Sequence, residues 1–143
     1  MNDALERTTP LVRLEIPPQS AYVAIVRLAV TSLGRGAGLD EEKLDDLKIA
    51  ISESCANAVL AVQETGVHSP IEISFSAGAE SLEVVVSHAG PADAGAEPEA
   101  DSHGFSTQRV MSMALLRSLV DEFDLVPRAG GGMQARLLLR RKT

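Results

Sequence analysis

The sequence predicts an α+β protein: a two-layer sandwich with a mixed, mostly antiparallel sheet and helices packed on one face. A long apolar run after Asp40 predicts a central helix, and two segments at residues 70–76 and 81–87 alternate apolar and polar residues as strands do. At 143 residues, with no repeat and no linker, the chain is expected to form a single domain over residues 1–143.

Composition and charge exclude several classes of function. The net charge of −7 argues against a nucleic-acid surface and suits a basic protein partner, although solubility alone explains it equally well. Cys55 is the one cysteine, so no internal disulfide is expected, and its small and apolar neighbours predict a buried side chain. No apolar run reaches membrane-spanning length and no signal-peptide pattern is present, so a cytoplasmic location without membrane contact is the expectation.

The first elements are a strand and a helix. Residues 11–16 alternate as a strand that Pro17-Pro18 ends, and Ser20 is expected to cap a helix that stops at Gly34. The glycine-rich stretch at residues 34–38 superficially resembles a phosphate-binding loop. It joins two helices, however, and lacks the following Lys-Ser or Lys-Thr, so it is interpreted as a helix C-cap and connector.

The second half of the chain predicts a hairpin, a loop, a helix and a final hairpin. The hairpin strands at residues 70–76 and 81–87 have one face available to cover the helices. The loop at residues 89–102 is rich in Ala, Gly, Pro and acids and is expected to be mobile. The segments after it are a helix at 105–123 and strands at 123–126 and 133–139 around a glycine turn.

The central helix, expected from Asp40 to Val62, carries an unusual polar pair. Asp40 can cap its first turn, and from Ile49 onward the helix is apolar or small nearly all the way round. Glu53 and Asn57 break that pattern and, four residues apart, share one face. The pair is either a partly exposed or locally satisfied structural pair, or a site in which Asn57 holds a hydrated cation and Glu53 orients or deprotonates a hydroxyl.

The order of the first strand, the first helix and the run at residues 45–59 closely resembles the bacterial anti-sigma factor serine kinases. These belong to the histidine-kinase-like ATPase superfamily, whose N box reads Glu, three residues, then Asn, as at Glu53 and Asn57. The likeness is strong over residues 11–62, fits the next strand pair in pattern, and fits the last forty residues loosely.

This resemblance implies the histidine-kinase-like ATPase fold and binding of ATP or ADP with Mg²⁺, with the nucleotide lid at residues 89–102. It also implies an anti-sigma factor that sequesters an alternative sigma factor and phosphorylates a serine of an anti-anti-sigma (STAS-type) antagonist. A homodimer through the edge of the first strand is a further family expectation. By resemblance, Glu53 is the catalytic base, Asn57 is the magnesium ligand, and Arg27 on the first helix is a partner contact.

The other nucleotide boxes of the superfamily depart from its pattern. The Asp that accepts from the adenine amino group is His88 here, whereas Gly90 of the same box is retained. The glycine pair that lets backbone approach the phosphates falls on residues 110–112, which carry side chains, and Gly104 is a substitute if the helix begins earlier. The final Gly-Thr reads Gly132-Met133 and loses the hydroxyl.

Three functions therefore remain open from the sequence. The first is an active anti-sigma serine kinase, which the intact N box supports. The second is a nucleotide-independent pseudokinase module that traps a sigma factor, which the altered boxes support. The third is an unrelated α+β enzyme in which Glu53 and Asn57 do other work. Histidines 68, 88 and 103 lie in separate segments without ligand spacing and predict no metal site of their own.

Overall fold

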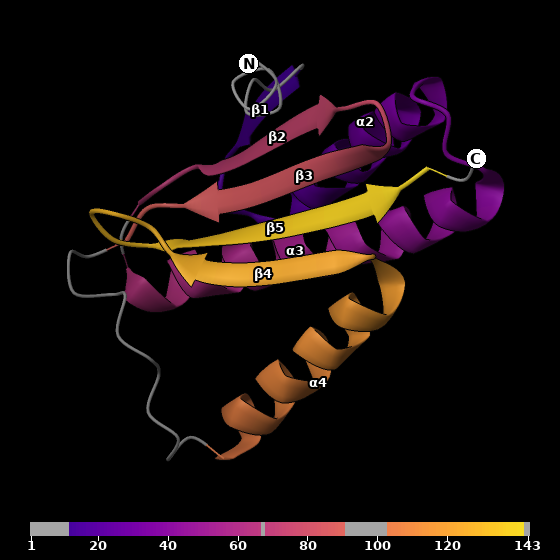
Figure 1. Cartoon of the computed structure of the whole chain (residues 1–143). Coiled ribbons are helices and arrows are strands. Elements are labelled where there is room, and N and C mark those ends of the chain that lie inside the picture. Colours follow the sequence, from indigo (N-terminus) through magenta and orange to yellow (C-terminus); the bar gives the residue numbers. More distant parts are fainter. Residues whose placement is uncertain (1–11, 67, 91–102, 142–143) are drawn as a thin grey trace.

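The computed structural model describes residues 12–66, 68–90 and 103–141, with the side chains of residues 103–106 left out (Figure 1). Strands and helices form an α+β sandwich, as the sequence predicts. In chain order they are β1 (Val12–Ile16), the 3-10 turn η1 (Ser20–Tyr22), α2 (Val23–Gly36), α3 (Glu41–Thr65), β2 (Ile71–Ala77), β3 (Ser81–His88), α4 (His103–Leu119), β4 (Glu122–Pro127) and β5 (Met133–Arg140).

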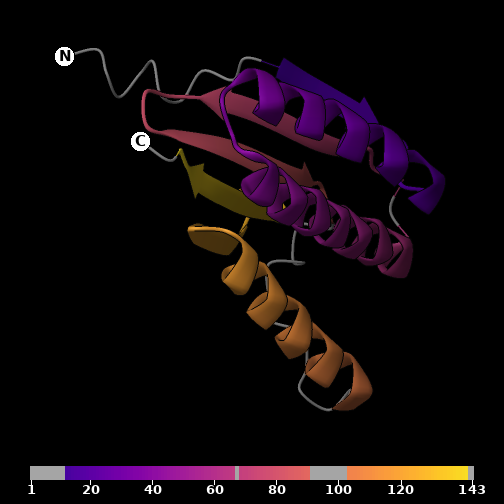
Figure 2. The same ribbon diagram turned by 90° about the vertical axis from the view of Figure 1, so that its right-hand side faces the viewer.

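The five described strands form one sheet in the order β1-β2-β3-β5-β4. Every pairing among them is antiparallel, so the sheet is antiparallel throughout its described strands rather than mixed. Figure 2 shows α2 and α3 side by side over one face of this sheet. In the register, His88 lies opposite Ile71 on one side and Met133 on the other, which places the end of β3 beside the beginning of β5.

The core lies between α3 and the sheet. Leu47, Ile51 and Cys55 of α3 are fully buried, and they face the alternating buried residues of the sheet, such as Ile73 and Leu137. Burial raises the pKa of the Cys55 thiol to about 12, so the thiol stays protonated and unreactive at neutral pH. The prediction that the Cys55 side chain is buried is confirmed.

The beginning and end of α3 follow from its capping residues. The Asp40 carboxylate accepts a hydrogen bond of 2.9 Å from the backbone N–H of Lys43, as predicted for an N-cap. The helix continues beyond the predicted end at Val62 and stops at Thr65, where Gly66 takes a left-handed conformation with φ of 74°. The extra turn extends the face that carries Glu53 and Asn57.

The prediction that the first helix stops at Gly34 is wrong, because α2 continues to Gly36. Gly34 lies where α2 crosses α3, and a Cβ there would meet side-chain carbons of Leu44 and Leu47 at 3.1 Å. Its role is therefore close helix packing rather than termination. Ser20 begins the 3-10 turn, and neither that turn nor α2 has a side-chain cap.

The structure bears on the predicted loop and on the possibility of a membrane-spanning helix. The predicted mobile segment at residues 89–102 lies, from residue 91 onward, outside the described residues. Within the described part of the chain, none of the helices has the length and apolar character that crossing a membrane requires.

Asp121, between α4 and β4, ties three parts of the fold together. Its Oδ2 accepts from the backbone N–H of Arg140 at 2.6 Å and lies 3.3 Å from the Lys43 ammonium at the start of α3. Burial alone would raise the pKa of Asp121. The hydrogen bond from Arg140 and the nearby Lys43 outweigh burial and hold this pKa below its ordinary value of 3.8.

Asp121→Asn is expected to lower the free energy of unfolding by about 1 kcal/mol near neutral pH, a figure reduced for partial exposure. A carboxylate whose pKa is lowered by folding stabilises the fold fully above its ordinary pKa, and that contribution disappears as the pH falls through the folded-state value. Urea unfolding at about pH 7 and about pH 2 should therefore show a difference between variant and wild type only at the higher pH. An equal difference in unfolding free energy between variant and wild type at both pH values would contradict a lowered pKa of Asp121.

Candidate functional site

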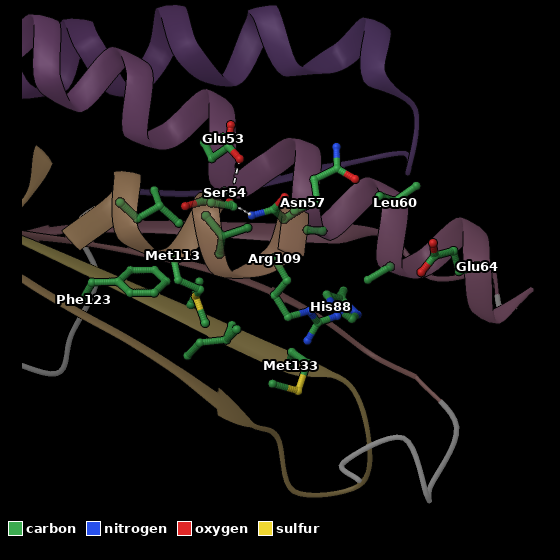
Figure 3. Close-up of a pocket in the computed structure, with 18 residues that line it drawn as sticks. Glu53, Ser54, Asn57, Leu60, Glu64, His88, Arg109, Met113, Phe123 and Met133 are labelled. Atoms are coloured by element: carbon green, nitrogen blue, oxygen red, sulfur yellow. Dashed lines mark hydrogen bonds between the residues drawn. The ribbon is translucent and has the colours of Figure 1, made fainter. Parts of the chain in front are cut away.

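A cavity of about 160 Å³ lies between α3, α4 and the helix-facing side of β3, β4 and β5 (Figure 3). Its walls combine apolar side chains, such as Met113, Leu116 and Phe123, with a smaller number of polar ones. An apolar cavity with a few convergent polar groups is the usual form of a small-molecule site, although typical volumes are larger, roughly 300–1,000 Å³. In this conformation α4 occupies one side of the space.

Glu53 and Asn57 both line this cavity and are joined by a third residue. The hydroxyl of Ser112 on α4 donates to Glu53 Oε2 at 2.6 Å, and Asn57 Nδ2 donates to Ser112 Oγ at 2.8 Å (Figure 3). Glu53 is half-buried and Asn57 is exposed. The interaction uses the amide nitrogen of Asn57, and its amide oxygen is the atom that a hard cation takes as a ligand.

His88 lines the cavity from the sheet and is only 6% exposed. Its Nδ1 lies 3.0 Å from the carbonyl oxygen of Ala89, which can only accept, so Nδ1 carries the proton of the neutral ring. In that tautomer Nε2 is a hydrogen-bond acceptor. His88 therefore keeps the acceptor character of the carboxylate that the superfamily has in this box, although without its charge. Gly90 follows two residues later and is half-buried.

The segment that replaces the glycine pair, residues 110–112, lies on α4. Val110 and Met111 are each 66% exposed, and only Ser112 of the three turns toward the cavity. Gly104 is the second residue of α4, in agreement with a helix that begins earlier than predicted, and it stays a prediction as a nucleotide contact.

Polar cavity residues without a predicted role of their own include Ser54, Arg109 and Ser112, and the sequence placed Ser112 only within the segment that replaces the glycine pair. Ser54 Oγ is buried and has no hydrogen-bond partner among the described residues, a costly state that a polar ligand could relieve. Arg109 brings a cation to the α4 wall of the cavity, in a chain that is acidic overall. The only sequence signal for the α4 residues is that Arg109, Ser112, Met113 and Leu116 share one helical face.

Arg27 lies on α2, and its guanidinium donates to Ser52 Oγ of α3 at 3.0 Å. This half-buried contact joins the two helices and occupies one nitrogen of the guanidinium group. A role of Arg27 in partner binding stays a prediction. Among the described residues, no group of three or more His, Cys, Asp or Glu side chains is arranged to hold a metal ion, so a cation here would need further ligands from a bound molecule.

Comparison with known proteins gives a consistent result. The family model described as histidine kinase-like ATPase domain matches residues 16–138. The serine-protein kinase RsbW of Bacillus pumilus is 26% identical over 136 residues, which cover 88% of this chain and 84% of that protein. The protein of the same name from Bacillus subtilis is 30% identical over 86 residues, which cover 60% of this chain and 54% of that protein.

Proposed function

The chain belongs to the histidine kinase-like ATPase domain family, and from this premise we propose that it binds Mg-ATP in the cavity between α3, α4 and the sheet. The observation that carries the proposal is the convergence of Glu53 and Asn57 from α3 and His88 from β3 on one cavity. His88 is distant in sequence from the other two. The family resemblance assigns Glu53 to catalysis, Asn57 to the magnesium ion and His88 to the adenine base.

Within this proposal Asn57 and Glu53 have different tasks. The amide oxygen of Asn57 would be one ligand of a magnesium ion, and the charge of that ion would stabilise the negative charge that develops during phosphoryl transfer. Glu53 accepts the proton of an incoming serine hydroxyl. The hydrogen bond of 2.6 Å from Ser112 supports this task, because a hydroxyl already reaches Glu53 Oε2 at the distance that general-base catalysis needs.

His88 suits the nucleobase, and Ser54 adds a second polar group to the cavity wall. Nε2 of neutral His88 can accept from an exocyclic amino group, and the unpartnered Ser54 hydroxyl can donate or accept. Gly90 and Gly104 remain the positions proposed for close backbone approach to the nucleotide. The positive charge of Arg109 on the α4 wall suits phosphate.

We further propose that the protein is an anti-sigma factor: it binds an alternative sigma factor and phosphorylates a serine on a STAS-type antagonist. The support is the family resemblance together with two relatives named serine-protein kinase. Homodimerisation through β1 belongs to the same proposal. It agrees with the place of β1 at one edge of the sheet, where its outer side pairs with no other described strand.

A pseudokinase of the same fold is the second candidate. The observations in its favour are the small cavity, the engagement of Glu53 and Asn57 with Ser112, and Met133 in place of the hydroxyl of the last box. Such a protein would bind the sigma factor and would release it by partner exchange alone.

One reconstitution separates these candidates. The purified protein is mixed with a candidate alternative sigma factor and, in parallel, with a candidate antagonist and radiolabelled Mg-ATP. The kinase proposal predicts a stable complex with the sigma factor and label on a serine of the antagonist. A complex without label supports the pseudokinase, and the absence of any complex with either partner overturns the anti-sigma proposal.

A further inference from the structure

Helix α4 is attached to the rest of the fold unevenly along its length. Its C-terminal end joins β4, and both views show the helix leaving the sheet toward its N-terminal end (Figures 1 and 2). Leu116, near the C-terminal end, is 1% exposed, whereas Val110 and Met111 are largely exposed. Ser112 lies between these regions, where apolar packing gives way to solvent.

At that position Ser112 makes two hydrogen bonds with α3. Its hydroxyl donates to Glu53 Oε2, and its oxygen accepts from Asn57 Nδ2. Ser112 is only 9% exposed, so its own hydroxyl has little access to water, whereas Glu53 is half-buried and Asn57 is exposed. The bond to Glu53 involves a charged acceptor and is therefore among the stronger hydrogen bonds that a serine can make.

We propose that Ser112 is an internal substitute for the acceptor serine, and that it latches α4 over the cavity until nucleotide or an acceptor hydroxyl displaces it. The inference rests on the proposed function, because it takes Glu53 as the base and Asn57 as the metal ligand. A hydroxyl that donates to Glu53 occupies the place that the hydroxyl of a protein substrate needs. The same contact holds the amide nitrogen of Asn57 against α4, whereas its amide oxygen takes no part in the bond.

The latch makes the resting protein self-inhibited. Mg-ATP has to displace the part of α4 that Ser112 holds against the cavity, and the substrate serine has to compete with Ser112 for Glu53. Removal of the Ser112 hydroxyl should therefore strengthen nucleotide binding, whereas a serine that contacts the phosphates directly would weaken binding when removed. The two roles of Ser112 thus predict changes of opposite sign.

The test compares Ser112→Ala with Ser118→Ala in the whole chain. Ser118 lies on the same helix but is exposed, and its hydroxyl donates only within α4, to Leu115 O at 2.7 Å. By calorimetric titration, Ser112→Ala is expected to bind Mg-ATP about tenfold more tightly than wild type, the equivalent of one net hydrogen bond to a charged group. Ser118→Ala is expected to leave the affinity unchanged. Ser112→Cys, which keeps a side chain of the same length in atoms but has a larger and weakly hydrogen-bonding sulfur, should follow Ser112→Ala.

Hydrogen exchange of α4 supplies a readout that needs no nucleotide. Loss of the latch should accelerate exchange of α4 amides around residue 112 in Ser112→Ala, and the amides of the central part of α3 should keep their protection. Unchanged exchange in α4, or weaker Mg-ATP binding by Ser112→Ala, overturns the latch. If neither the wild type nor Ser112→Ala binds Mg-ATP, the proposed nucleotide function fails. Faster exchange in α4 of Ser112→Ala would then still support a latch on Glu53 and Asn57.

Discussion

Gly132→Ala is expected to lower the free energy of unfolding by about 3 to 5 kcal/mol, one of the largest effects of any single substitution in the chain. Gly132 has φ of 88°, and a Cβ there would lie 2.0 Å from His88 O and 2.8 Å from Ala89 Cα. Both contacts are with backbone, which cannot move aside as a flexible side chain can. The end of β3 and the start of β5 would have to separate.

Gly130→Ala is the matched control for this prediction. Gly130 has nearly the same φ, 89°, but a Cβ there would meet nothing within 4 Å. It should cost only the strain of a left-handed residue, about 1–2 kcal/mol. Chemical denaturation of the two variants separates the steric contact from the strain, and equal losses would contradict the close approach. Because His88 belongs to the strand end that moves, Gly132→Ala should also impair nucleotide binding.

Glu53→Gln is expected to slow phosphoryl transfer to the antagonist serine by about 10²- to 10⁴-fold, the usual contribution of a general base. Glutamine keeps the size of the side chain and an oxygen that can accept from Ser112, but it cannot take up a proton. Affinity for Mg-ATP should therefore change little. Transfer rates and calorimetric affinities measured on the same preparations test both parts.

Glu64→Gln is the control for Glu53→Gln. Glu64 also lines the cavity from α3 but is exposed and three turns further along the helix. Its substitution should leave the transfer rate near that of wild type. An unchanged transfer rate in Glu53→Gln, with normal Mg-ATP affinity, would show that another group accepts the proton of the antagonist serine.

Much of the fold can be predicted from the sequence because its elements have clear local signals. The alternation in β2 and β3 and the Asp40 cap of α3 depend on neighbouring residues alone. The end of α2 could not be predicted, because Gly34 has the usual signature of a helix C-cap. Its actual role depends on Leu44 and Leu47 of another helix, a contact that no local pattern contains.

The candidate site divides in the same way. Glu53 and Asn57 could be found because helical spacing places both on one face of α3. Ser112 could not be assigned a role, since its contacts with that pair join residues more than fifty positions apart. His88 could be placed in the adenine box from the sequence, but its acceptor character depends on its hydrogen bond with Ala89 rather than on the residue type alone.

The central claim is that nucleotide binds in this cavity through Asn57. Isothermal titration with Mg-ATP and Mg-ADP tests it most directly, on wild type, Asn57→Ala, and the control Gln63→Ala on an exposed part of α3. We expect saturable binding that Asn57→Ala abolishes and that Gln63→Ala leaves unchanged. The absence of binding at about millimolar nucleotide by the folded wild-type protein, or equal affinities in wild type and Asn57→Ala, would contradict it.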